Sequence, residues 1–193
     1  MKNILFRSVM MTLIMGFLTC ALYPLMVTIT ANSFFKKETQ GSLVSYQDKI
    51  VGSALLGQEF KSPLFFHARP SFNNYNAMNS SSAHLALSEK KYLTYLQTQI
   101  ETLKSENPSL TNEKIPVHLV SYSASGLDPH ISPTAAEAQI ERIARMREMN
   151  FDMLKKLVDS HIEHPTWNIL GEARVNVLLL NLALEKRFPM GVK

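Results

Sequence analysis

The stretch Ser8–Ala31, SVMMTLIMGFLTCALYPLMVTITA, decides the architecture of this chain because its 24 residues contain no charged side chain. At about 1.5 Å per residue, a helix of that length exceeds the roughly 30 Å hydrocarbon core of a bilayer. A cleavable signal is the alternative, but its apolar region usually runs for only about 7–15 residues. The sequence therefore predicts one uncleaved transmembrane helix over residues 8–31.

The charges on the two sides of this segment bear on its orientation. Two basic side chains and the α-amino group lie in residues 1–7, and Lys36 and Lys37 follow the segment. This distribution favours a cytoplasmic N-terminus under the positive-inside rule. We therefore expect a single-pass protein of the cell (inner or plasma) membrane, with residues 1–7 cytoplasmic and residues 32–193 forming one extracytoplasmic soluble domain.

The composition excludes several classes of protein. The 193 residues carry 20 basic and 16 acidic side chains, a formal net charge of +4. That balance is unlike the basic stripe of a protein that binds nucleic acid by electrostatics, so we expect no nucleic-acid partner. The single cysteine, Cys20, lies in the apolar segment, which excludes an intrachain disulfide and a cysteine zinc cluster.

Patterns in the soluble part predict an α+β domain attached to the one N-terminal transmembrane helix. Short apolar groups between turn residues predict two or three strands over 40–60, and the aromatic, asparagine-rich stretch 62–88 is typical of a long ordered loop. Apolar residues spaced by three and four predict a helix capped by Ser88 and ending at Glu106. Residues 116–123 alternate in part between apolar and polar and predict a strand.

Capping residues predict two further helices. Ser132, which precedes a proline, caps the first, and Asn150 or Asp152 caps the second, which His164–Pro165 ends. The apolar run 171–188 is either a strand that turns into a helix or one buried helix, and its periodicity does not decide between them.

The stretch Ser123–Gln139, SASGLDPHISPTAAEAQ, holds the groups from which a catalytic or nucleotide site could be built. It lacks G-x-S-x-G, and Ser125, Asp128 and His130 are too close in sequence for the usual triad geometry. The chain has no Gly-rich phosphate-binding motif, although backbone amides near Gly126 could form a small anion nest. We interpret the stretch as a turn and a capped helix start, without a catalytic residue, whose exposed face serves partner contact.

Histidines near the end of the third helix raise the possibility of a metal site. His161 and His164 have ligand spacing on a helix, with Glu163 between them and His118 or His130 as a further donor. A proline follows at once, so the second imidazole falls on a fraying helix end, where a cation is favoured anyway. We predict surface histidines and no metal site.

The residues alone leave two classes of function open. One is a non-catalytic subunit or binding module, and the other is a membrane-anchored extracytoplasmic enzyme or metal-binding module. Isolated charges among apolar neighbours suit the first, because an arginine can clamp carboxylates or carbonyls across a contact. The candidate partner-contact residues are Arg69, Asp128, His130, Arg142, Glu172 and Arg174.

Four blocks of sequence are similar to a known family and cover most of the chain. They are YPLMVTITANSFF with QGSLV, VGSALLGQEFKSPLFFHARPSFNNYNAM, SASGLDPHISPTAAEAQIERIAR and LGEARVNVLLLNLAL. In order and spacing they resemble the KdpC family, the C subunits of bacterial Kdp potassium-transporting P-type ATPases. Two departures concern local loops: residues 79–87 contain no glycine, and Ala173 stands where the family often has proline.

The resemblance implies a non-catalytic subunit of a high-affinity, ATP-driven potassium uptake complex. Its partners would be a K⁺-binding channel-like subunit, a P-type ATPase subunit that carries the catalysis, and a small single-helix subunit. The family is thought to stabilise assembly, and a catalytic-chaperone role that raises the ATPase subunit's affinity for ATP has been proposed for it. The chain would have no cofactor of its own, and ATP would contact the residues that match that proposal: Ser123, Ser125, Gly126 and Gln139.

Overall fold

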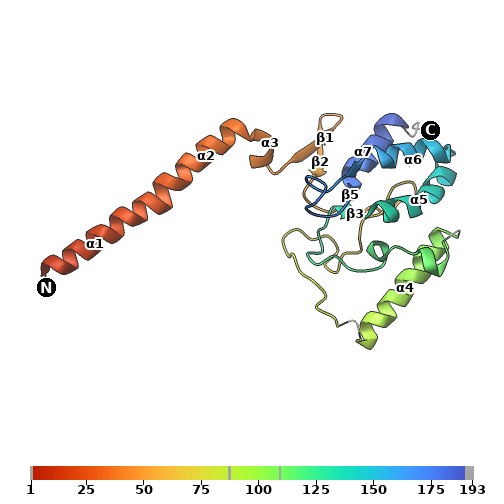
Figure 1. Cartoon of the computed structure of the whole chain (residues 1–193), viewed down its shortest axis with the longest axis horizontal. Helices are drawn as coiled ribbons and strands as arrows, with labels where there is room; N and C mark the ends of the chain where they lie inside the picture. Colours follow the sequence, from red (N-terminus) through yellow and green to blue (C-terminus); the bar gives the residue numbers. More distant parts are fainter. Residues whose placement is uncertain (1, 87, 109, 190–193) are drawn as a thin grey trace. The chain divides into compact units, whose positions relative to one another are not determined.

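The computed structural model describes residues 2–86, 88–108 and 110–189, and it divides the chain into two compact units, residues 1–43 and 44–193 (Figure 1). Helices and short strands are combined in the chain, which confirms the α+β class. The two units are described in turn.

The first unit is one long helix. It comprises α1 (Lys2–Phe17), a π-helical turn (Leu18–Leu22) and α2 (Tyr23–Phe34), and the short α3 (Lys36–Thr39) follows it. The helix has 33 residues, and its most apolar 18-residue window reaches a mean hydropathy of 1.9, so it is long and apolar enough to cross a membrane. It extends beyond residues 8–31 at both ends.

Hydroxyl groups along this helix are compatible with a lipid environment. Thr12, Thr19 and Thr30 each donate a hydrogen bond to the carbonyl four residues earlier, at 2.8–2.9 Å. A polar group in hydrocarbon must find a partner inside the protein, and this local bond supplies one. Pro24, which has no N–H to donate, stands in the first turn of α2, directly after the π-helical turn.

Two strands follow the long helix and α3, as the sequence predicts for residues 40–60. β1 (Leu43–Tyr46) and β2 (Lys49–Ser53) form a two-stranded sheet. Gln47 and Asp48 between them have φ values of 50° and 60°, the pattern of the two-residue hairpin turn that matches strand twist.

A long connection leads from β2 to α4 (Lys90–Glu106) and contains neither helix nor strand in its described residues, which agrees with the ordered loop predicted over 62–88. The predicted cap at Ser88 is wrong. The N-cap position is Glu89, and no side chain accepts a hydrogen bond there. Because the helix begins one residue later than predicted, Ser88 precedes the cap position.

The strand predicted over residues 116–123 is also wrong. A 3₁₀ turn, Val117–Leu119, occupies its first half, and the Leu119 N–H donates to the Pro116 carbonyl at 3.0 Å. Val117 faces solvent while Leu119 is buried. Alternation over so few residues does not distinguish a strand from a turn whose side chains diverge.

A second sheet has three very short antiparallel strands in the order β3-β5-β4. These strands are β3 (His130–Ile131), β4 (Ile162–Glu163) and β5 (Arg174–Asn176). In the register, Ile131 and Ile162 both pair with Val175, on opposite sides of β5. Glu163 pairs with Arg174, so the sheet brings distant charged residues together.

Three helices complete the domain: α5 (Pro133–Met146), α6 (Phe151–Asp159) and α7 (Val177–Arg187). The predicted caps are confirmed: Ser132 Oγ accepts from the Ala135 N–H at 3.2 Å, and Asn150 Oδ1 accepts from the Asp152 N–H at 2.7 Å. The expectation that α6 runs to His164 is wrong, because β4 follows it.

The C-terminal run resolves into a strand that turns directly into a helix. β5 ends at Asn176, whose Oδ1 accepts from the Leu179 N–H at 3.1 Å and so caps α7. Its amide nitrogen donates to the Ala54 carbonyl at 2.8 Å. One asparagine thus starts the helix and fixes the chain that leaves β2.

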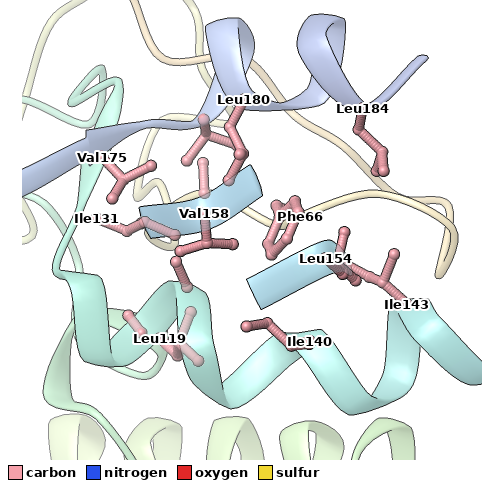
Figure 2. Close-up of a cluster of buried hydrophobic side chains, with 14 of the residues drawn as sticks. Phe66, Leu119, Ile131, Ile140, Ile143, Leu154, Val158, Val175, Leu180 and Leu184 are labelled. Carbon is pink, nitrogen blue, oxygen red and sulfur yellow. The ribbon is translucent and has the colours of Figure 1, made fainter. Parts of the chain in front are cut away.

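The hydrophobic core lies between α5, α6 and α7. Figure 2 shows Leu180 and Leu184 of α7 pointing toward Ile140 and Ile143 of α5, with Phe66 between them. All five of these side chains are fully buried. The core therefore includes a residue from the long connection as well as residues from helices.

Candidate functional site: a row of charges on the sheet

Buried side chains hold the long connection in an extended course and thereby place Arg69. Asn181 exchanges two hydrogen bonds with the backbone of Phe66, at 2.8 and 2.9 Å, as a neighbouring strand would. Gln139 does the same for His67, at 2.7 and 3.2 Å. The Tyr75 hydroxyl donates to the Arg69 carbonyl at 2.6 Å, and burial raises the pKa of Tyr75 to about 12.

Asp128 accepts from residues that are far apart in the chain. Arg69 Nη1 donates to its Oδ2 at 3.2 Å, and the His130 N–H donates to its Oδ1 at 2.9 Å. Burial alone would raise the pKa of Asp128, but hydrogen bonds from His130 and the charge of Arg69 outweigh it and lower the pKa. Asp128 is therefore an ionised acceptor that joins the long connection to the sheet.

The row continues across the sheet. His130 Nδ1 lies 3.6 Å from Asp128 Oδ1, and its Nε2 lies 3.9 Å from Glu163 Oε2. Arg174 Nε donates to the same Glu163 oxygen at 2.9 Å, between residues that face each other on β4 and β5. We call Arg69, Asp128, His130, Glu163 and Arg174 the charge ladder.

The structure thus joins four of the six candidate partner-contact residues, and it adds one that the sequence did not assign to this role. The sequence indicates Glu163 only as a companion of possible metal ligands. Its pairing with Arg174 depends on strands of two and three residues, which are too short to leave a periodic signal. Glu172, the fifth candidate, is exposed on the connection between β4 and β5.

Arg142 is a correction, because it is only 2% exposed and cannot present its charge to a partner. Its guanidinium donates to the carbonyls of Pro63 and Phe65, to Asn107 Oδ1 and to Gln139 Oε1. Burial lowers the pKa of Arg142 to about 10, so the side chain remains charged at neutral pH. Its role is to hold the interior together.

The four residues expected to meet ATP do not share one surface. Ser125 is exposed, whereas Ser123 and Gly126 are buried, and Gln139 is 0% exposed. The Gln139 amide is engaged by His67, Ala135 and Arg142. Gly126 has φ +71°, and an added Cβ would lie 2.4 Å from Asn73 Oδ1. The stretch is a tight turn against the long connection.

The histidines considered for metal binding also take other roles. His161 Nδ1 lies 2.8 Å from the Leu157 carbonyl, and His164 follows β4 on an exposed connection. Within the described residues, no group of three or more His, Cys, Asp or Glu side chains is arranged to hold a metal ion.

A cleft of about 460 Å³ lies away from these histidines. Its lining includes Tyr95 of α4 and Tyr75 and Tyr122 of the connecting segments.

The fold and the site together define a class of protein: a small α+β domain that follows one N-terminal helix of membrane-crossing length and carries a row of paired charges on its sheet. Comparison with known proteins narrows this class. The family model KdpC, described as the c chain of K⁺-transporting ATPase, matches residues 5–186. The chain belongs to the KdpC family.

Relatives in several bacteria match this chain over nearly their whole length and support this assignment. The chain is 41% identical to a potassium-transporting ATPase KdpC subunit of Bradyrhizobium diazoefficiens, over 93% of this chain and 94% of the relative. It is 40% identical to the subunit of that name in Koribacter versatilis, over 98% of both chains. For Bacillus cytotoxicus the identity is 39%, over 96% of this chain and 97% of the relative.

Proposed function

We propose that this chain is the non-catalytic subunit of an ATP-driven potassium uptake complex and stabilises its assembly. Its partners in this proposal are a K⁺-binding channel-like subunit, a P-type ATPase subunit that carries the catalysis, and a small single-helix subunit. The observation that carries the proposal is the family match over residues 5–186, which includes both the membrane-crossing helix and the soluble domain.

The charge ladder is suited to docking for a physical reason. Each of its members is held by at least one neighbour on a different segment, so the row presents a fixed pattern of charge. Arg174 and Glu163 are exposed, with 57% and 44% of their side chains accessible. Complementary charge between partners contributes to specificity and to the rate of association.

The Asp128→Asn variant tests this use of the ladder. Asparagine keeps the shape and can still accept from the His130 N–H, but it loses the charge that pairs with Arg69. We expect a lower yield of complex when the chain is co-expressed with its partners, and unchanged ATP turnover per assembled complex. Pull-down yield and ATPase rate, both normalised to the ATPase subunit, measure the two quantities.

The matched control for this test is Asp159→Asn, because Asp159 is an exposed carboxylate at the end of α6 and lies outside the ladder. It should leave the yield at the wild-type level. A wild-type yield of Asp128→Asn complex with abolished turnover would contradict the proposal and indicate a part in catalysis.

We also propose that the soluble domain is extracytoplasmic and that any effect on ATP affinity is indirect. The two basic side chains and the α-amino group on the N-terminal side of the apolar segment 8–31 favour a cytoplasmic N-terminus. The buried Gln139 amide supports the indirect reading, since its hydrogen-bonding groups are engaged inside the domain. Such coupling requires that the chain bind two states of the assembled complex differently.

A cysteine at Met78, which is 95% exposed, tests this topology. In a Cys20→Ala background, we expect Met78→Cys to react with a membrane-impermeant thiol reagent in spheroplasts or whole cells. Cys20→Ala alone is the control for background labelling. Reaction only after the membrane is broken would place the domain in the cytoplasm and favour direct contact of Ser125 with nucleotide.

A further inference from the structure

The connection between β4 and β5 contains an exposed apolar loop, residues 165–170, which we call the tryptophan loop. Trp167 is 82% exposed, Ile169 80% and Leu170 58%. The loop contains no charged residue, and Trp167 is the only tryptophan in the chain. Single exposed apolar side chains are ordinary on protein surfaces, but three within four consecutive residues mark a contact surface.

Hydrogen bonds make this loop a compact, preorganised projection. Thr166 and Leu170 exchange two backbone hydrogen bonds, at 2.9 and 3.0 Å, and the Ile169 N–H donates to the Thr166 carbonyl at 3.2 Å. Trp167 and Asn168 occupy the two central positions of the turn, with φ values of 54° and 59°. The loop therefore holds its apolar side chains at a fixed place beyond the strands.

The conformation of Trp167 is costly, which supports a functional use. Left-handed backbone at this turn position favours glycine, asparagine or aspartate, and a bulky residue there is uncommon. Strain of this kind costs about 1–3 kcal/mol and clusters at functional contacts. In this structure Trp167 is 82% exposed, so burial inside the domain offers little compensation for that cost.

We propose that the tryptophan loop is a docking element that inserts Trp167 and Ile169 into an apolar pocket of a co-assembling protein subunit. The inference rests on the proposed role in a multi-subunit complex and names a surface for it. The loop joins two rungs of the charge ladder, because Glu163 precedes it and Arg174 follows it. The apolar loop is therefore attached at both of its ends to residues of the charge ladder.

Charge decides between a protein pocket and a lipid surface. An interfacial membrane loop is normally flanked by basic residues that attract anionic headgroups. Here the flanking residues are Glu163, Glu172 and Arg174, two carboxylates to one guanidinium, with His164 beside them. This balance gives no attraction to an anionic bilayer, whereas a preorganised aromatic anchor with a polar rim is the usual composition of a protein interface.

Trp167→Ser in the full-length chain, co-expressed with the channel-like and ATPase subunits, tests the proposal. Tagged chain is purified, and the recovered subunits are identified and quantified by mass spectrometry. A tryptophan that fills a pocket is a typical hot spot, so we expect recovery at limiting concentration to fall by roughly tenfold or more. Ile169→Ser should also lower the recovery of these subunits. Met78→Ser, which removes an apolar side chain that is even more exposed, should recover wild-type amounts.

Three further observations complete this test. Unfolding temperatures of both loop variants should match the wild type, because neither side chain is buried in the domain. If wild-type chain recovers the subunits and Trp167→Ser recovers them equally, the docking inference is overturned while the assembly proposal stands. If wild-type chain recovers nothing, the assembly proposal fails, and the inference fails with it.

The lipid alternative has its own readout, because Trp167 is the only tryptophan. Full-length chain is reconstituted in phosphatidylcholine vesicles with and without acyl-brominated lipid, which quenches only a fluorophore that it contacts. We expect the Trp167 emission to be insensitive to bromine and accessible to aqueous iodide. Strong bromolipid quenching would overturn the protein pocket in favour of the bilayer.

Discussion

Replacing Arg142 with methionine is expected to destabilise the α+β domain by about 3 kcal/mol, because the buried hydrogen-bond acceptors of Arg142 lose their donor. The affected acceptors are the carbonyls of Pro63 and Phe65 and the Asn107 side chain. Each unsatisfied buried acceptor costs about 1–3 kcal/mol, and removing the buried charge recovers only part of that sum. In a domain of this size, the loss lowers the unfolding temperature by roughly 10 °C.

Thermal unfolding of detergent-solubilised full-length chain, followed by circular dichroism, measures this effect. The control is Arg145→Met, the same substitution on the exposed side of the same helix, which should stay within about 0.5 kcal/mol of the wild type. Equal unfolding temperatures for the two variants would show that the Arg142 network contributes nothing net to stability.

Features set by neighbouring residues could be predicted from the sequence. The N-termini of α5 and α6 are examples, because Ser132 and Asn150 cap them through amides two or three residues away. The apolar, charge-free segment is another, since a run of that length needs only its composition to indicate a membrane-crossing helix. Long-range contacts were not required for either prediction.

Features that depend on residues far apart in the chain could not be predicted from the sequence. Arg142 reads as a surface charge because its carbonyl acceptors lie 77 and 79 positions earlier in the chain. The three-stranded sheet could not be predicted for the same reason, although a strand was one of the two alternatives for the run that contains β5. The strands β3, β4 and β5 have two or three residues each, and their pairing exists only after the chain has folded. Residues 116–123 show a longer alternation and therefore predict a strand, but the structure has a 3₁₀ turn there.

The candidate site shows both cases. Arg69, Asp128, His130 and Arg174 were singled out by residue type, and the fold alone placed them in one row with Glu163. Gln139 matched a proposal about nucleotide, yet its neighbours in space are the backbone of His67 and the guanidinium of Arg142. The type of a polar residue therefore indicates that it makes specific contacts, but it does not indicate whether the side chain is buried or exposed.

Phe66→Ala is expected to have the largest effect on stability, about 3–5 kcal/mol, because it opens a cavity in the middle of the core. The Phe66 ring is fully buried between α5 and α7 (Figure 2). Both hydrogen bonds between Asn181 and residue 66 involve the backbone, so alanine leaves them in place. The loss therefore reports packing, with little contribution from hydrogen bonding.

Phe72→Ala is the matched control, since it removes the same ring from the same connection at a position that is 46% exposed. Phe72 packs edge-on against Tyr122 at 5.6 Å, a contact that contributes only about 1 kcal/mol. Denaturant unfolding of full-length chain gives both free energies. A Phe66→Ala loss no larger than that of Phe72→Ala would mean that the long connection is not part of the core. In that case the extended course that places Arg69 at the charge ladder would need another support.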